Sequence, residues 1–274
     1  DSGPWIVAAD GSRRFLGRYD QATWSPRGLY VGVTRGRELL ALTPRGDKRW
    51  AHARPGLVEL PRWSPSGFRI AYFEGSSFRV IAGDGTGDRL LVRRAPRLAP
   101  AWRPVQRHVL AVPIAPAVVA LFDVDGRRRL WTARVAGRLH ELSWSADGSR
   151  LLALHEGGYT LLTAGGRVLA RRNFGGATAQ TAAFAPAGRQ FALIVGRPGR
   201  SEVRVGNRLV FTGAGAFNAL EWSPDGRWLL VSWGTADQWV FIRSAGVRRI
   251  AAVSNVARQF ESEHAPDLAG WCCP

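Results

Sequence analysis

The sequence predicts an all-β fold, a single β-propeller, and three observations carry this prediction. A short phrase recurs about every forty residues: an aromatic residue, serine or a near equivalent, proline or aspartate, and then glycine. A short apolar run follows each copy. Glycine-bearing turns then separate further strand-like segments at regular distances. A fixed period of this length, carried by strands and turns, is typical of a propeller built from four-stranded blades.

Five copies of the phrase are clear and a sixth is degenerate. The clear copies are WSPRG at 24–28, WSPSG at 63–67, WSADG at 144–148, FAPAG at 184–188 and WSPDG at 222–226. The degenerate copy is WRPVQ at 102–106, and a last tryptophan stands at 271. In such a turn proline presets φ at the first position, aspartate bonds the backbone two residues on, and glycine adopts the left-handed conformation that closes it.

Each repeat divides into four strands, called A to D here in chain order. Strand A ends at the aromatic residue, and the apolar run after the turn is strand B. We expect strand B at Leu29–Val33, Arg69–Phe73, Val109–Val112, Leu151–Leu154, Phe191–Val195 and Trp228–Trp233. We expect strand C at Glu38–Leu42, Phe78–Ala82, Val118–Val124, Tyr159–Thr163, Glu202–Val205 and Gln238–Arg243. A turn with glycine at 46, 85 or 87, 126, 166, 206 and 246 leads into an arginine-bearing strand D.

The N-terminus supplies one further hairpin, with strands at Trp5–Ala9 and Arg13–Gly17. Residues 269–271 resemble a seventh strand A. We therefore expect one propeller domain over residues 1–274, whose closing blade combines residues 1–18 with 269–274. Such a closure removes the exposed sheet edges of a linear array. Seven blades are favoured, although the seventh strand B is missing; six blades with an appended hairpin are the alternative.

The repeated turn resembles that of the TolB-like, WD-repeat-like propellers, whose blades carry Trp-Ser-Pro-Asp-Gly between the first two strands. The match is closest at Trp222–Gly226 and the repeats cover the whole chain. The resemblance implies an extracytoplasmic protein that binds other proteins, with the tryptophans serving as packing residues. The repeats are also similar to the propeller domains of prolyl-oligopeptidase-type hydrolases, but the hydrolase half is absent from this sequence.

Composition points to a strongly basic chain. The formal net charge is +17, and Lys48 is the only lysine. A basic surface can attract nucleic acid, anionic lipid or acidic glycans. The arginines follow the same turn in successive repeats, which favours a distributed basic rim over one clustered polyanion site. These positions are Arg13, Arg14, Arg89, Arg127, Arg128, Arg129, Arg167, Arg208, Arg248 and Arg249.

No methionine occurs, so we expect that a targeting segment has been removed and that the chain is part of a longer product. The longest apolar run, Val109–Phe122, is too short to span a bilayer and contains two prolines. We expect a monomer.

The sequence contains no recognisable catalytic motif. There is no Gly-x-Ser-x-Gly elbow, and the glycine-rich segment 83–87 reads as a turn between two strands. The five histidines are scattered, and the cluster of Glu261, Glu263 and His264 reads as a solvated loop. We expect no cofactor and no catalytic residue from these patterns.

Cys272 and Cys273 are adjacent, and normal disulfide geometry does not fit neighbouring residues. Three interpretations stay open: two reduced small apolar side chains, a strained vicinal disulfide, or a covalent link to another chain. With no other cysteine, cysteine usage does not decide the compartment.

Periodicity gives the best functional clue. In propellers strand A lines the central channel, and its first residue lies at the channel mouth. Four residues before each aromatic residue stand Asp20, Glu59, Leu98, His140, Gln180, Asn218 and Asp267. All but Leu98 are polar, and convergent polar groups on rigid strands are what a binding site needs. The alternative is that strand starts are exposed and polar in any case.

The sequence therefore favours a non-enzymatic, extracytoplasmic β-propeller that binds a protein or peptide at its channel mouth. The binding residues would be Asp20, Glu59, His140, Gln180, Asn218 and Asp267. One alternative is a lactonase-like, metal-dependent hydrolase with a metal held by Asp20, Glu59, His140, Asn218 and Asp267 at the same mouth. Another is a polyanion-binding module that uses the arginine-rich rim.

Overall fold

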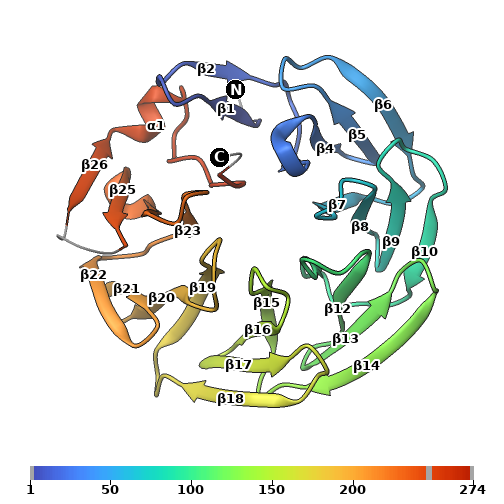
Figure 1. Cartoon of the computed structure of the whole chain (residues 1–274). Coiled ribbons are helices and arrows are strands. Elements are labelled where there is room, and N and C mark those ends of the chain that lie inside the picture. The colour runs from blue at the N-terminus through green and yellow to red at the C-terminus, as the bar shows by residue number, and fades with distance from the viewer. Residues whose placement is uncertain (1–2, 245–248, 272–274) are drawn as a thin grey trace. The chain divides into compact units, whose positions relative to one another are not determined.

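The computed structural model describes residues 3–244 and 249–271 and consists almost entirely of antiparallel sheets (Figure 1). The chain folds as two compact units. The first contains the residues up to Ala115 together with Val119–Thr132, and the second contains Pro116–Val118 together with the described residues from Ala133 onward. Cys272, Cys273 and the glycine turn expected at 246 lie outside the described residues.

The first unit begins with a two-stranded sheet and continues with four-stranded sheets. The two-stranded sheet pairs β1 (Trp5–Val7) with β2 (Arg13–Phe15). The next sheet contains β3 (Gln21–Trp24), β4 (Val31–Arg35), β5 (Glu38–Leu42) and β6 (Lys48–Ala53). The third contains β7 (Val58–Trp63), β8 (Arg69–Glu74), β9 (Ser77–Ala82) and β10 (Arg89–Val92). The fourth contains β11 (Ala101–Trp102), β12 (Val109–Ala115), β13 (Val118–Asp123) and β14 (Arg128–Arg134).

The second unit contains three four-stranded sheets. The first has β15 (Leu139–Trp144), β16 (Arg150–His155), β17 (Gly158–Thr163) and β18 (Val168–Asn173). The next has β19 (Thr178–Phe184), β20 (Phe191–Arg197), β21 (Arg200–Val205) and β22 (Arg208–Ala214). The last has β23 (Ala219–Trp222), β24 (Trp228–Trp233), β25 (Gln238–Arg243) and β26 (Ile250–Ser254). A short helix α1 (Val256–Gln259) follows, and the 3₁₀ turns are η1 (Pro26–Gly28) and η2 (Gly234–Ala236).

The all-β prediction is confirmed: within residues 3–244 and 249–271 the structure has six four-stranded sheets and, at the N-terminus, one two-stranded sheet. Some boundaries differ by about two residues. The first strand B begins at Val31 rather than Leu29, because η1 replaces the tight turn and leaves Leu29 62% exposed. No strand is assigned over 269–271, and the Trp271 ring packs edge-on against Phe241. The closing blade stays a prediction.

The core lies between successive sheets within each unit. Strands B and C are mostly buried, whereas the outer strand D is exposed, completely so along β18. Between the blades of β3–β6 and β7–β10 the core contains Leu39, Val58, Trp63, Ile70 and Tyr72. In the second unit an equivalent core lies between the blades of β19–β22 and β23–β26. Apolar burial between flat sheet faces therefore stacks each blade on its neighbour.

The aromatic residue of the repeat also makes a polar link between blades. The indole nitrogen of Trp102 donates to the carbonyl of Arg62 at 2.8 Å, and that of Trp222 donates to the carbonyl of Ala183 at 2.9 Å. Each acceptor immediately precedes the aromatic residue of the previous repeat. The indole nitrogen of Trp63 is buried and finds no hydrogen-bond partner among the described residues.

In the repeated turn, aspartate and glycine have the roles that the sequence predicts. At 222–226 the amide of Arg227 donates to Asp225 Oδ1 at 3.0 Å, and Gly226 has a φ of 69°. The structure adds a role for serine, which the sequence did not suggest. Ser223 donates to Asp225 at 2.6 Å and accepts from the amide of Trp228 at 2.9 Å, so one hydroxyl connects the turn to the start of strand B.

Candidate functional site

Five of the predicted mouth residues stand at or beside the first residues of strand A in their blades, whereas no strand is assigned around Asp267. Asp20 and Glu59 belong to the first unit, and His140, Gln180, Asn218 and Asp267 belong to the second. None of the hydrogen bonds and ion pairs found for the described residues joins one member of this set to another. The convergence of all six on one opening stays a prediction.

Several of these side chains hold the turn between strands B and C of their own blade. Asp20 Oδ2 accepts from the amide of Gly36 at 2.7 Å, and Asn218 Oδ1 accepts from the amide of Gly234 at 3.2 Å. A Cβ placed on Gly196 would lie 2.7 Å from Gln180 Nε2, so this amide also lies against the turn sixteen residues later. Asp20 and Asn218 therefore stabilise these turns as well as being exposed.

Glu59 differs from the others because its partner is another side chain. Its carboxylate accepts from Arg97 Nε at 2.6 Å in a two-contact pair, and the Arg97 side chain is 63% exposed. This pair raises the pKa of Arg97, mainly through the hydrogen bond to Glu59. An ion pair of this kind presents both charges at the end of the blade where strand A begins.

His140 and Gln180 each carry a buried polar atom in the side chain. His140 Nε2 and Gln180 Oε1 are inaccessible to solvent and find no partner among the described residues. Burial lowers the pKa of His140. Both residues stand in the second unit, at the starts of neighbouring blades, and neither is a freely exposed ligand.

The turns between strands B and C carry charge at the same end of the blades. Arg35 donates to Glu38 at 2.8 Å, and Arg54 donates to Glu74 at 3.0 Å. In the second unit, the buried carboxylate of Glu202 accepts from Arg197 at 2.9 Å and from Arg204 at 3.2 Å. Burial raises the pKa of Glu202, but the hydrogen bonds from Arg204 and Arg197 outweigh it and the net shift is downward.

Sequence reasoning missed a serine–histidine–aspartate array in the first unit. Ser66 Oγ lies 2.9 Å from His108 Nε2, and His108 Nδ1 is bonded to Asp125 Oδ2. Because an ionised carboxylate only accepts, Nδ1 carries a proton, and in the neutral imidazole Nε2 accepts from the serine hydroxyl. This is the atom order of a hydrolytic triad. Ser66 belongs to one repeat, and His108 and Asp125 belong to the next. No local sequence motif therefore predicts that they meet.

The surroundings of this array favour a structural role. The amides beside Ser66 are already used, since Gly67 N donates to the carbonyl of Ser64 at 2.9 Å and Phe68 N donates to Ser66 Oγ at 3.3 Å. They therefore offer no oxyanion hole in this geometry. His108 is 2% exposed, and Asp125 also accepts from Arg69 and Arg89. The array links the blade of β7–β10 to the blade of β11–β14.

A second missed group is centred on Asp88, whose side chain is 8% exposed. Its carboxylate accepts from Tyr72 at 2.6 Å, from Arg79 at 2.5 Å and from Arg54 at 3.1 Å. Burial raises the pKa of Asp88, but the hydrogen bonds and charges of these partners outweigh it and the pKa is lowered. Burial also raises the pKa of Tyr72, and the Asp88 carboxylate adds to that effect.

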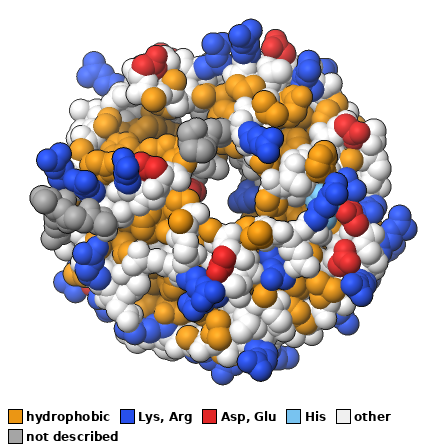
Figure 2. Space-filling model, viewed as in Figure 1, with side chains coloured by type: hydrophobic (Ala, Val, Ile, Leu, Met, Phe, Trp, Pro, Cys, Tyr) orange, Lys and Arg blue, Asp and Glu red, His pale blue; other side chains and the backbone are white. Residues whose placement is uncertain are grey.

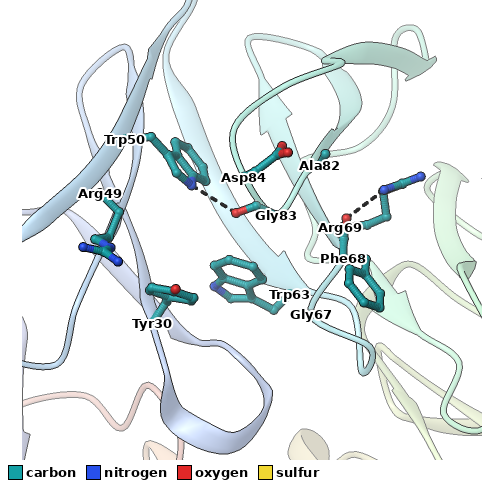
Figure 3. Close-up of a pocket in the computed structure, with 10 residues that line it drawn as sticks. All are labelled: Tyr30, Arg49, Trp50, Trp63, Gly67, Phe68, Arg69, Ala82, Gly83 and Asp84. Carbon is teal, nitrogen blue, oxygen red and sulfur yellow. Dashed lines mark hydrogen bonds between the residues drawn. The ribbon is translucent and has the colours of Figure 1, made fainter.

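Two recesses open at the other end of the first unit's blades, near the turns between strands A and B and between strands C and D. The larger has a volume of about 500 Å³ and is walled by Tyr30, Trp50, Trp63 and Phe68 (Figure 3). The smaller has a volume of about 390 Å³ and is bordered by Arg69, Arg89 and Arg127. Arg69 and Ala82 line both, so the two recesses adjoin.

No group of three or more His, Cys, Asp or Glu side chains suited to a metal ion is found within residues 3–244 and 249–271. In the same part of the chain, no helix has the length and apolar character needed to cross a bilayer.

Neither a protein-family model nor a curated protein matches the sequence. The fold, however, is similar to many solved structures. One is the β-propeller domain of Cps50 (Swd1) from Myceliophteria thermophila, with a TM-score of 0.68, 13% identity, and coverage of 92% of this chain and 90% of that one. Another is a chain of the mitotic checkpoint complex, with a TM-score of 0.68, 16% identity, and coverage of 87% and 81%. A third is the C-terminal WD40 domain of Sif2, with a TM-score of 0.65, 11% identity, and coverage of 87% and 74%.

At these identities the likeness concerns the fold and not the chemistry. The repeated sheets, the linking tryptophans and the structural neighbours agree with one another: the chain has a β-propeller fold of the WD40 type.

Proposed function

We propose that this chain is a non-enzymatic β-propeller that binds a protein or peptide at the channel mouth, where strand A begins in each blade. The observation that supports it most is the rigid polar end of the first unit's blades. Asp20 is fixed by the Gly36 amide, and Glu59 is paired with an exposed Arg97. Polar groups held in place by the scaffold bind with a small ordering cost.

The neighbouring turns strengthen this proposal. Arg35 and Glu38, beside the Asp20 turn, expose charges of both signs. A mixed-charge surface suits a polar protein contact more than a buried apolar ligand. WD40-type propellers commonly serve as protein-binding scaffolds, and one of the similar structures is a chain of a multiprotein complex.

The test is capture from an envelope extract at moderate and high salt, with the wild-type chain and the double variant Asp20→Ala/Glu59→Ala as baits. The matched control is Asp10→Ala/Asp47→Ala, which removes two exposed carboxylates that cap turns at the opposite end of blades in the same unit. We expect a partner that survives high salt, is lost by the first variant and is kept by the control. Equal capture by all three baits would show that the partner does not bind at the end of the blades where strand A begins.

The same extract addresses location and the two alternative functions. We propose an extracytoplasmic location because the repeated turn resembles that of TolB-like propellers; a partner confined to cytoplasmic fractions would contradict it. A stoichiometric Ca²⁺ or Zn²⁺ in the purified protein would favour the metal-dependent hydrolase. Capture of only salt-sensitive polyanions, equal for all baits, would favour the basic rim.

A further inference from the structure

The larger recess of the first unit has walls that are fixed before any ligand arrives. Trp50 donates through its indole nitrogen to the carbonyl of Gly83 at 3.0 Å, and the ring of Trp63 stacks on Tyr30 with centroids 6.5 Å apart and planes 19° apart. Figure 3 shows these three rings around a common space, with Arg49 beside Tyr30. A volume of about 500 Å³ accommodates an aromatic side chain and part of its backbone.

Two glycines of the turn between strands C and D allow the backbone to form the floor of the larger recess. A Cβ on Gly85 would lie 2.8 Å from the Trp50 ring, and a Cβ on Gly83 would lie 2.3 Å from the carbonyl of Gly67. The backbone therefore packs directly against the rings. The preformed aromatic surface is completed by Phe68, which is 57% exposed at the rim.

The adjoining recess is basic. Arg69, Arg89 and Arg127 border it, and Asp88 is the one carboxylate among its lining residues. The Asp88 charge is already matched by Arg79 and Arg54. Asp125 accepts from both Arg69 and Arg89 at 3.1 and 3.3 Å, and within the described residues the guanidinium of Arg127 makes no ion pair. Asp84 lines the aromatic recess, but Arg49 and Arg69 line it as well, so positive charge is in surplus beside the aromatic walls.

From this juxtaposition we infer a second binding site, which takes an acidic peptide segment carrying one aromatic side chain. The aromatic ring enters the recess between Tyr30, Trp50 and Trp63, and flanking carboxylates lie over Arg69 and Arg127. Aromatic and arginine side chains are the residue types that contribute most to protein interfaces. The charge surplus selects an acidic partner.

This site is separate from the proposed mouth site. Its residues stand at the end of strand A, the start of strand B, the turn between strands C and D and the start of strand D, whereas Asp20 and Glu59 stand at the start of strand A. The two groups occupy opposite ends of the same antiparallel blades. The inference does not rest on the proposed function, and either can fail alone.

The test is an NMR titration of protein labelled with ¹⁵N in its tryptophan indoles, using the probe peptide Gly-Ser-Asp-Glu-Trp-Glu-Asp-Ser-Gly. Matched peptides replace the tryptophan with alanine or the acids with their amides. The Trp50 and Trp63 signals are assigned through Trp50→Phe and Trp63→Phe. We expect these two signals to shift with the acidic tryptophan peptide, and each matched peptide to bind about tenfold more weakly.

Two pairs of variants locate the contacts. Phe68→Ala and Arg127→Glu should each weaken binding about tenfold. Their controls are Leu29→Ala and Arg167→Glu, which change exposed residues at the same positions of other repeats and should leave affinity unchanged. All four positions are exposed, so the variants keep the fold.

Any of the following results would overturn the inference. The first is that the Trp50 and Trp63 signals do not move. The second is that the amide peptide binds as tightly as the acidic one, or that Arg127→Glu behaves like Arg167→Glu. The third is that heparin shifts the same signals while the peptide does not, which would assign the recess to a polyanion.

Discussion

At the residue scale, the buried charges of the first unit are tied to specific partners rather than to bulk solvent. Asp88 is the clearest case, because Tyr72, Arg79 and Arg54 all depend on its carboxylate. Removing one partner of a buried ion pair leaves the others desolvated and uncompensated. Ser66, His108 and Asp125 are likewise held by specific partners, and their contacts join two blades.

We therefore expect Asp88→Asn to lower the free energy of unfolding by about 3 kcal/mol, because the neutral amide leaves Arg54 and Arg79 with the single carboxylate of Glu74 as their counter-charge. Urea denaturation measures this. Asp47→Asn is the control, since Asp47 also follows the turn glycine but is exposed. It should change stability by less than about 0.5 kcal/mol. Equal effects of the two substitutions would show that the buried network contributes nothing specific.

The same carboxylate predicts a pH dependence. The pKa of Asp88 is lower in the folded protein than in the unfolded chain, where it is about 3.9. Its stabilisation is therefore fully present above that unfolded value and is lost as the pH falls through the lower folded value. Urea midpoints should decline on acidification below about pH 4, and less steeply in Asp88→Asn. A variant that follows the wild-type curve would contradict this assignment.

At the scale of the element, the linking tryptophans distinguish one blade interface from another. Trp102 and Trp222 are 7% exposed and Trp63 is 8% exposed, yet only Trp63 lacks an acceptor for its indole nitrogen among the described residues. Trp102→Phe and Trp222→Phe lose an interblade hydrogen bond and leave a carbonyl unsatisfied, whereas Trp63→Phe loses no such bond.

The first two substitutions should therefore cost about 1 kcal/mol more than Trp63→Phe, measured by urea denaturation under identical conditions. All three remove a similar ring volume, so the difference isolates the hydrogen bond. If Trp63→Phe is the most costly of the three, the indole nitrogen is not what links the blades.

The strands and turns were largely predictable because each depends on a local pattern that repeats. The serine, aspartate and glycine of 222–226 act through neighbours a few residues away, and strands B and C are continuous apolar runs. The tasks of Asp20 and Asn218 were not predicted, because each needs the register that places a turn sixteen residues later beside the strand start. His108 stands just after the degenerate copy at 102–106, and that irregularity was the one available signal.

At the scale of the whole molecule, the net charge of +17 is spread over many turns and outer strands. Figure 2 shows basic side chains interspersed with apolar and acidic ones on the face in view. A distributed surface predicts weak polyanion binding with no single essential arginine. Arg127→Glu and Arg167→Glu should lower heparin retention equally, measured by the salt concentration at elution. A loss confined to one of them would reveal a clustered site.

We propose that the end of the blades where strand A begins binds a protein. Hydrogen–deuterium exchange on the chain with and without its captured partner tests it most directly, because the turns between strands B and C are short and contain exposed residues such as Arg35, Arg37 and Gly75. We expect the partner to slow exchange in segments 35–38 and 74–77. Protection confined to the opposite turns at 45–48 and 83–87, with none at the strand-A end, would contradict it.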